Sequence, residues 1–274
     1  MHETEVDIES TDGLRLFARE WRPDEPARGV ICVLHGLGEH SGQYEEVADA
    51  FEQKSIALIG LDLRGHGQSA GQRGHIPSYS ALLDDVDALL AKAAERHPGV
   101  PRFLYGHSLG GNLALNHAIR RQPDVAGVIA TGAWFWMTKD LALYKRFLAS
   151  LLEPVWPTLS FSTGTSGDDS LESDGLRRNA DLFHRRITLR LLMEMRRAGL
   201  WAVRNADLLT TPALLIHGAL DPVTAPKGTM EFARRAGATC QGILLSGVGH
   251  NPHEEDESTI PALVEWVNER LLSR

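Results

Sequence analysis

The chain has 274 residues, of which 43% are hydrophobic, and this is enough for a large core within one domain. Its 36 acidic and 28 basic residues give a net charge of −8, which argues against nucleic acid as a partner, because a phosphate backbone is held by a basic surface. No apolar run reaches the roughly 18 residues of a membrane span, and residues 1–10 lack the apolar stretch of a signal peptide, so we expect a cytoplasmic protein.

Short apolar runs that alternate with helix-like segments predict an α/β fold. Apolar and polar residues alternate from Leu14 to Ala18, as in a half-exposed strand. The later runs are continuously apolar, which is typical of central parallel strands buried on both faces: residues 30–34, 56–59, 103–105, 128–130, 213–216 and 243–245. Helices are expected over residues 43–53, 79–96, 109–121, 227–236 and 258–272. We therefore expect a mostly parallel central sheet with helices on both faces.

Residues 133–207 interrupt this alternation. No strand is evident in this stretch, whose first part is rich in large apolar side chains and whose last part, residues 188–205, has a helical pattern. Between them, residues 162–173 are rich in Gly, Ser, Thr and Asp and predict an exposed loop. We predict that residues 1–132 and 208–274 form the core and that residues 133–207 form a helical cap. The cap is expected over the carboxyl edge of the sheet, where α/β sheets bind ligands.

A Gly-x-Ser-x-Gly pentapeptide follows the apolar run that ends at Tyr105. It reads Gly106-His107-Ser108-Leu109-Gly110. This pattern is typical of a nucleophile elbow, a tight turn from strand to helix that exposes the serine hydroxyl. The glycines are needed because the turn brings strand and helix very close together. The elbow predicts a serine hydrolase with Ser108 as nucleophile.

A serine nucleophile needs a base, and the base needs an acid that orients it. Asp221 follows the strand expected at residues 213–216, and His250 follows the strand expected at residues 243–245. Both lie on the sheet edge expected for Ser108, in the chain order serine, acid, histidine that this arrangement requires. His253 is the competing histidine, and we interpret His107 as structural. The spacing predicts a Ser108, Asp221, His250 catalytic triad, and no spacing typical of a metal site is visible.

The negative charge that develops on an attacked ester needs two backbone N–H donors. Leu109, directly after the nucleophile and at a helix N-terminus, is expected to supply one of them. The second is expected from Leu37, in the glycine-rich loop that follows the strand ending at Leu34. A third glycine-rich loop, residues 62–69, contains Asp62 and Arg64, which we interpret as residues that hold the loop by hydrogen bonds and ion pairing.

Four segments together resemble monoacylglycerol lipases and related lysophospholipase-like hydrolases. The segments are His-Gly-Leu-Gly-Glu-His-Ser-Gly-Gln-Tyr (35–44), Asp-Leu-Arg-Gly-His-Gly-Gln-Ser (62–69), Gly-His-Ser-Leu-Gly-Gly (106–111) and Gly-His-Asn-Pro-His-Glu (249–254). The resemblance implies the α/β-hydrolase fold with a helical cap, and hydrolysis of a single fatty acyl ester on glycerol without a cofactor. It also implies that Ser108, Asp221 and His250 are the triad and that Leu37 and Leu109 are the oxyanion donors.

The cap is expected to contact the substrate. In the resembled family a cap carboxylate can contact the glycerol head group, and the match of Asp-Leu-Phe-His (181–184) to a family Asp-Pro-Leu segment points to Asp174 for this role. Apolar cap residues such as Trp134, Phe135 and Met137 are candidates to line an acyl tunnel. An exposed apolar rim on the cap would allow peripheral contact with a membrane.

Two alternatives remain open at this stage. A lysophospholipase or a short- to medium-chain carboxylesterase would use the same catalytic residues, so only the pocket distinguishes them from a monoacylglycerol lipase. A non-catalytic ligand-binding protein on the same fold would be expected to lack a triad residue. An epoxide hydrolase or dehalogenase is disfavoured, because these need aspartate in place of Ser108.

Overall fold

An eight-stranded sheet forms the centre of the protein. The structure, a computed structural model, describes residues 2–139, 142–163 and 180–273. The strand order is β1-β2-β4-β3-β5-β6-β9-β10, in which β2 is antiparallel to β1 and β4 and all other neighbours are parallel. The strands of this sheet are β1 (His2–Glu9), β2 (Arg15–Arg22), β3 (Gly29–Leu34), β4 (Ile56–Leu61), β5 (Arg102–His107), β6 (Gly127–Thr131), β9 (Ala213–Gly218) and β10 (Cys240–Leu245).

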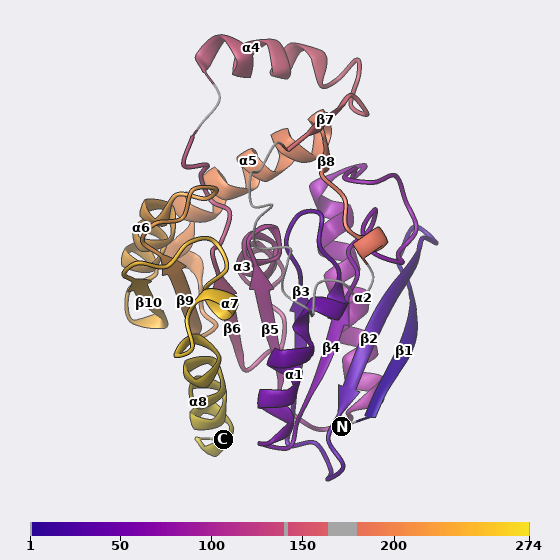
Figure 1. The fold of residues 1–274 in the computed structure, drawn as a ribbon, viewed down its shortest axis with the longest axis vertical. Helices are drawn as coiled ribbons and strands as arrows, with labels where there is room; N and C mark the ends of the chain where they lie inside the picture. Colours follow the sequence, from indigo (N-terminus) through magenta and orange to yellow (C-terminus); the bar gives the residue numbers. More distant parts are fainter. Residues whose placement is uncertain (1, 140–141, 164–179, 274) are drawn as a thin grey trace.

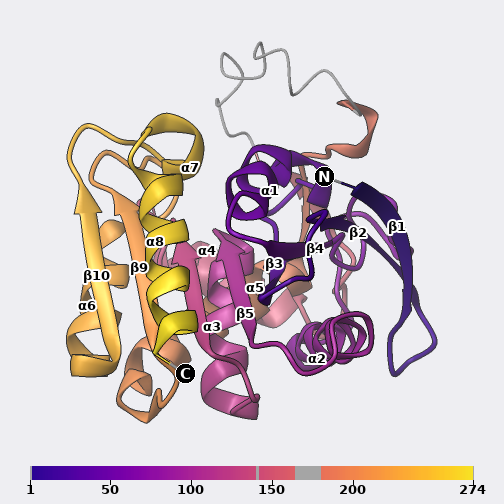
Figure 2. The same cartoon turned by 90° about the horizontal axis from the view of Figure 1, so that it is seen from below.

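Helices cover both faces of this sheet (Figure 2). Helices α1 (Glu45–Glu52) and α8 (Thr259–Leu272) lie on one face, and α2 (Tyr79–Arg96), α3 (Leu109–Arg121) and α6 (Pro226–Ala236) lie on the other. Each face has its own apolar core: Phe51 and Trp266 belong to the first, and Leu113 and Phe232 to the second. The predicted α/β class with a mostly parallel sheet is confirmed.

Two features of the sheet differ from the sequence analysis. The N-terminal residues form the edge strand β1, which the sequence analysis did not predict, because only Val6 and Ile8 of this strand are buried. The run at residues 243–245 lies in β10, which is the opposite edge strand rather than a central one, and Leu244 in it is 48% exposed.

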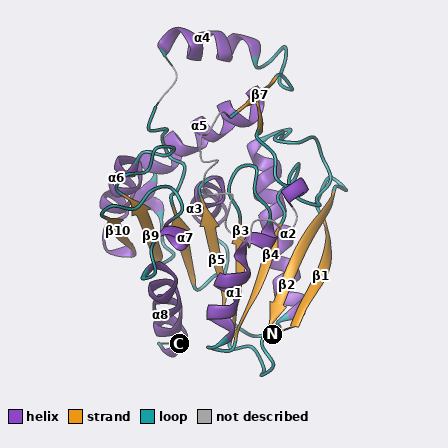
Figure 3. Cartoon of the chain, viewed as in Figure 1, coloured by secondary structure: helices purple, strands orange, loops and turns teal. Residues whose placement is uncertain are grey.

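The described residues of the stretch 133–207 cross the carboxyl ends of the central strands (Figures 1 and 3). They contain α4 (Leu143–Leu152), α5 (Leu189–Arg204) and the 3₁₀ helices η3 (Ala180–Leu182) and η4 (Ala206–Leu208). They also contain two short strands, β7 (Ser160–Ser162) and β8 (Arg186–Thr188), which pair antiparallel, so the expectation that this stretch has no strand was wrong. Its role as a separate cap, with the boundaries given above, stays a prediction.

Helix α4 lies at the far end of the molecule, beyond α5 (Figure 1). Ala149 on α4 packs against Leu189 and Met193 of α5. The buried carboxylate of Glu153, directly after α4, accepts hydrogen bonds from Arg197 and pairs with Arg190 at 3.0 Å. Among the described helices, none combines the length and apolar character that crossing a bilayer requires.

Candidate active site

Ser108 occupies a sharp turn between β5 and α3. Its backbone angles, φ 51° and ψ −110°, are unusual for a residue with a side chain, and such strain is maintained where the surrounding structure requires it. A Cβ atom on Gly106 would lie 2.1 Å from the carbonyl oxygen of Gly110, and one on Gly110 would lie 1.9 Å from the carbonyl oxygen of Leu34. Glycine at both positions therefore allows strand, turn and helix to pack this closely.

His250 links Ser108 to Asp221. Its Nε2 lies 3.1 Å from Ser108 Oγ, and its Nδ1 lies 2.7 Å from Asp221 Oδ2. The three residues reach the same site from the carboxyl ends of β5, β9 and β10. His253 is placed elsewhere, with its ring stacked on Tyr44 at a centroid distance of 5.6 Å. The structure thus brings together the three side chains that the sequence analysis selected, with His250 rather than its competitor on the serine.

The side chain of Asp221 is fully buried and is surrounded by hydrogen-bond donors. Its Oδ1 accepts the backbone N–H groups of Val223 and Thr224, at 2.7 and 2.9 Å, and its Oδ2 accepts the Thr224 hydroxyl at 2.7 Å. Burial would raise the pKa of Asp221, but hydrogen bonds from His217, His250 and Thr224 outweigh burial and hold that pKa well below its usual range. The carboxylate is therefore charged and fixed opposite His250 Nδ1.

The sequence analysis missed two of these contacts on Asp221. His217, at the end of β9, is buried with its Nε2 3.0 Å from Asp221 Oδ2 and its Nδ1 2.7 Å from the hydroxyl of Thr229. Thr224, three residues after Asp221, binds both carboxylate oxygens. A histidine ending an apolar run four residues before the predicted acid was the available signal.

The candidate oxyanion donors are the backbone N–H groups of Leu37, in the loop after β3, and of Leu109. Leu109 is the first residue of α3, so its N–H has no partner within the helix. The loop of Leu37 packs against the start of α3, where Gly110 meets Leu34 and His35. Within the residues that the structure describes, no hydrogen bond from either N–H group is found.

Neighbouring groups fix the backbone on the amino side of Leu37. The N–H of Gly36 donates to Glu39 Oε2 at 2.8 Å, and the carbonyl oxygen of Gly36 lies 2.7 Å from His35 Nδ1. Because His35 Nε2 accepts the N–H of Leu63 at 3.0 Å, its Nδ1 carries the proton and donates to Gly36. These contacts orient the peptide that precedes the Leu37 N–H.

The loop of residues 62–69 supports the site without entering it. The Asp62 carboxylate accepts the backbone N–H groups of Ser41 and Gln68, at 2.6 and 2.8 Å. Arg64 forms a buried ion pair with Asp85, with Nη2 and Oδ1 2.7 Å apart. Both residues hold the loop, as predicted.

Glu39 lies in the same loop as Leu37, and 20% of its side chain is exposed. Burial, together with the nearby Glu254 carboxylate, raises the pKa of Glu39 to about 7 against the lowering effect of the Gly36 N–H. His107 Nε2 lies 3.8 Å away, but burial holds the pKa of His107 well below its usual range, so it stays neutral. The loop is therefore built over a carboxyl group that titrates near neutral pH.

This carboxyl group predicts a pH dependence of stability. Between about pH 4.5 and 7 the folded protein binds more protons at Glu39 than the unfolded chain does, so this group lowers stability as pH rises through that range. Glu39→Gln keeps an acceptor for Gly36 and removes the titration. We expect the free energy of unfolding of the variant, relative to the native protein, to rise by up to about 3 kcal/mol between pH 5 and pH 8 in urea titrations. A difference that does not change with pH would contradict the assignment.

The predicted substrate-contact residues lie in different surroundings. Trp134 and Phe135 are buried, with the ring of Phe135 stacked on Phe232 at 4.9 Å, whereas Met137 is half-buried and forms a β-bridge with Thr224. Asp174 lies outside the described residues. The contribution of all four residues to substrate binding stays a prediction.

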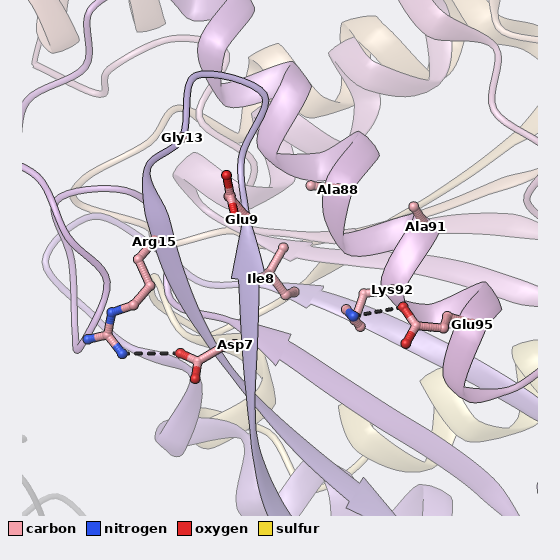
Figure 4. A pocket seen from close by; sticks show the side chains of 9 residues that line it. All are labelled: Asp7, Ile8, Glu9, Gly13, Arg15, Ala88, Ala91, Lys92 and Glu95. Atoms are coloured by element: carbon pink, nitrogen blue, oxygen red, sulfur yellow. Dashed lines mark hydrogen bonds and ion pairs between the residues drawn. The ribbon is translucent and has the colours of Figure 1, made fainter.

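A hollow of about 750 Å³ lies elsewhere, between β1 and α2 (Figure 4). It contains none of the triad or oxyanion residues, and its charged side chains pair with one another, as in Arg15 with Asp7 and Lys92 with Glu95. These pairs and the small alanines around them suit a solvated surface groove.

Comparison with known proteins shows the family. A sequence model of the family described as Serine aminopeptidase, S33 matches residues 25–257, most of the chain. The chain belongs to this family. The resemblance to monoacylglycerol lipases that the motifs predicted is confirmed. The chain is 30% identical to human monoglyceride lipase over 279 residues, which cover 95% of this chain and 89% of that protein.

Two further comparisons fit the S33 assignment. The crystal structure of a monoacylglycerol lipase from Paleococcus ferrophilus superimposes with a TM-score of 0.80 and 25% identity, covering 98% of this chain and all of that one. An abhydrolase domain-containing protein of Dictyostelium discoideum is 32% identical over 96% of this chain, which spans 28% of that protein's length. The protein is an α/β-hydrolase and a carboxylic ester hydrolase similar to monoacylglycerol lipases.

Proposed function

We propose that the protein hydrolyses monoacylglycerol to a free fatty acid and glycerol through an acyl-enzyme. The observation that carries this proposal is the continuous contact from Asp221 through His250 to Ser108, beside two backbone N–H groups that no other described residue uses. This arrangement suits acyl transfer, because the nucleophile, the base and the orienting acid are already within hydrogen-bond reach of one another.

In the first step, Ser108 Oγ attacks the acyl carbonyl carbon and its proton passes to His250 Nε2. Asp221 holds the other ring N–H and stabilises the imidazolium that forms. The N–H groups of Leu37 and Leu109 stabilise the negative oxygen of the tetrahedral intermediate, where one such donor typically contributes about 10²–10³ in rate. The intermediate then breaks its bond to the glycerol oxygen, which leaves with the proton from His250.

In the second step, water attacks the acyl group on Ser108 while His250 takes a proton from the water. Collapse of this intermediate breaks the bond to Ser108 Oγ, which regains the proton, and releases the fatty acid. No group other than the ester, water and these residues is required for the balance of the reaction.

The choice of substrate rests on the relatives. Monoglyceride or monoacylglycerol lipases match this chain at 25–30% identity over nearly its whole length. The apolar side chains exposed from α4 to β7 suit a lipid substrate better than a soluble short-chain ester. The alternatives, a lysophospholipase and a short- to medium-chain carboxylesterase, would use the same catalytic residues.

A substrate panel tests this proposal. Monoacylglycerols of several chain lengths, a diacylglycerol, a triacylglycerol, a lysophospholipid and a short nitrophenyl ester would be compared by kcat/KM. We expect monoacylglycerol to have the highest value. A clear preference for lysophospholipid or for the short ester would reject this substrate and leave the chemistry of the triad unchanged.

We also propose that α4 brings the protein to a lipid surface. The segment from α4 to β7 presents large apolar side chains to solvent: Leu143, Tyr144, Phe147, Leu148, Leu151, Leu152, Val155, Trp156 and Phe161. Within α4 the charged residues are Lys145 and Arg146, both basic in a chain of net charge −8. An amphipathic helix with an apolar face and basic residues suits the surface of an anionic membrane.

The α4 proposal predicts a loss of membrane binding. Phe147 is 64% exposed and Leu151 is 56% exposed, and burial of two such side chains in lipid stabilises binding by a few kcal/mol, on the order of 1.5–3 kcal/mol for each fully buried side chain. The double variant Phe147→Ser, Leu151→Ser is expected to bind vesicles of phosphatidylcholine and phosphatidylglycerol about tenfold more weakly or worse in sedimentation assays. The control is Leu272→Ser, which changes an exposed leucine at the end of α8, away from α4. Equal binding by both variants would reject the proposal.

A further inference from the structure

His184 connects the segment before β8 to the oxyanion loop. It lies two residues before Arg186, the first residue of β8, and is half-buried. Its backbone N–H donates to the carbonyl oxygen of Gly38 at 3.1 Å. Gly38 has φ +83°, and a Cβ atom on it would lie 2.1 Å from the carbonyl oxygen of His184. The two backbones are therefore in direct contact, one residue beyond Leu37.

The side chain of His184 anchors this contact to a second loop. Its Nδ1 accepts the backbone N–H of Arg186 at 3.2 Å, so the proton is on Nε2, which donates to the carbonyl oxygen of Gly65 at 3.1 Å. The ring also packs against His66, with centroids 4.5 Å apart. Both ring nitrogens are used, and the residue is fixed against the loop of residues 62–69.

This contact completes the positioning of the Leu37 N–H. On the amino side of Leu37, Gly36 is held by Glu39 and His35. On its carboxyl side, the hydrogen bond that the described residues supply to the Gly38 carbonyl comes from His184. The His184 side chain anchors its own backbone to Gly65. Without this side chain the backbone N–H of His184 would no longer be fixed, and the Gly38 carbonyl would lose its fixed partner. Donors that stabilise an oxyanion act through a geometry that is set before the reaction.

We propose that His184 is a positioning residue for the oxyanion hole. It acts by holding Gly38 against the loop that contains Gly65 and His66. The proposal rests on the proposed function, because Leu37 must act as an oxyanion donor. It also gives a role to the Gly-His pair at residues 65 and 66, which bridges β8 and the catalytic loop.

Two variants of similar size test the clamp. His184→Leu fills the space and cannot donate to Gly65, whereas His184→Gln retains a donor at about the reach of Nε2. His75→Ala is the matched control, because His75 Nδ1 lies 3.1 Å from the Thr188 hydroxyl and ties the same segment to the body of the protein without touching the oxyanion loop. Thermal unfolding of each variant would be measured alongside activity, so that a loss of fold is not read as a loss of rate.

The readouts are kcat and KM for a short nitrophenyl ester and the affinity for a trifluoromethyl ketone, which forms a tetrahedral oxyanion on the serine. For His184→Leu we expect kcat and ketone affinity to fall together by about tenfold, less than the roughly 10²–10³ of losing a donor entirely, with KM within about twofold. His184→Gln should recover most of the loss, and His75→Ala should stay within about twofold of the native enzyme.

Either of two results would overturn the clamp. An equal loss in His75→Ala would mean that any loosening of this segment slows the enzyme, and a change in KM alone would place His184 in substrate binding. Failure of the proposed substrate is seen separately, because the native enzyme would then hydrolyse the nitrophenyl ester but not monoacylglycerol. Full activity of Ser108→Ala would instead reject the site, and the role of His184 with it.

Discussion

Ser108→Ala is expected to lower kcat by about 10⁴- to 10⁶-fold while leaving KM close to that of the native enzyme. The reason is that Oγ, 3.1 Å from His250 Nε2, is the atom that forms the acyl bond, whereas the substrate is held by other groups. Alanine can adopt the same backbone angles at the turn, so the fold is expected to remain. Steady-state hydrolysis of a monoacylglycerol and of a nitrophenyl ester gives both constants.

A second measurement identifies the serine directly. A fluorophosphonate probe should label the native protein and leave Ser108→Ala unlabelled. Ser41→Ala is the matched control, because Ser41 is buried in the neighbouring loop and its hydroxyl has no hydrogen-bond partner among the described residues. Labelling and near-normal turnover in Ser108→Ala would show that the nucleophile lies elsewhere.

Asp221→Asn is expected to lower kcat by about 10⁴-fold with the site otherwise intact. Asp221 accepts N–H and O–H groups from Val223, Thr224, His217 and His250. An asparagine amide must turn its own N–H₂ group toward some of these donors, so His250 loses the acceptor that keeps its proton on Nδ1. The Nε2 lone pair is then no longer available to take the proton from Ser108.

The pH profile of kcat, together with unfolding curves, separates this effect from a loss of fold. Asp207→Asn, at an exposed position in η4, serves as control and is expected to behave as the native enzyme. Loss of activity of less than about tenfold in a folded Asp221→Asn variant would assign the orienting acid to another residue.

The sequence predicted the central elements well because their signals are local. Helices α2 and α3 have the predicted bounds, since apolar periodicity and the elbow define their ends. Strand β1 was missed because most of its residues are polar, although its partner β2 follows directly after a short turn. The pair β7 and β8 was missed because each strand has only three residues and the two strands are more than twenty residues apart in the chain.

The candidate site shows the same division. Ser108, Asp221 and His250 each follow a run that was predicted as a strand, so their position at one sheet edge could be inferred from order alone. His217 and His184 could not be assigned in this way, because each acts through a contact formed by folding, with Asp221 in one case and with Gly38 and Gly65 in the other. His184 contacts Gly38 and Gly65, which are distant in sequence, so it leaves little local pattern, whereas His217 lies four residues before Asp221 and could have been noticed.

The exposed apolar face of α4 has a consequence for how the enzyme meets its substrate. If α4 docks on a lipid surface as proposed, the protein and a monoacylglycerol would share a two-dimensional phase, and encounters would depend on the mole fraction of substrate in that surface. Dilution of the substrate with inert lipid, at constant bulk concentration, would then slow the reaction. A short ester dissolved in water reaches Ser108 without the surface, and its hydrolysis would be indifferent to the added lipid.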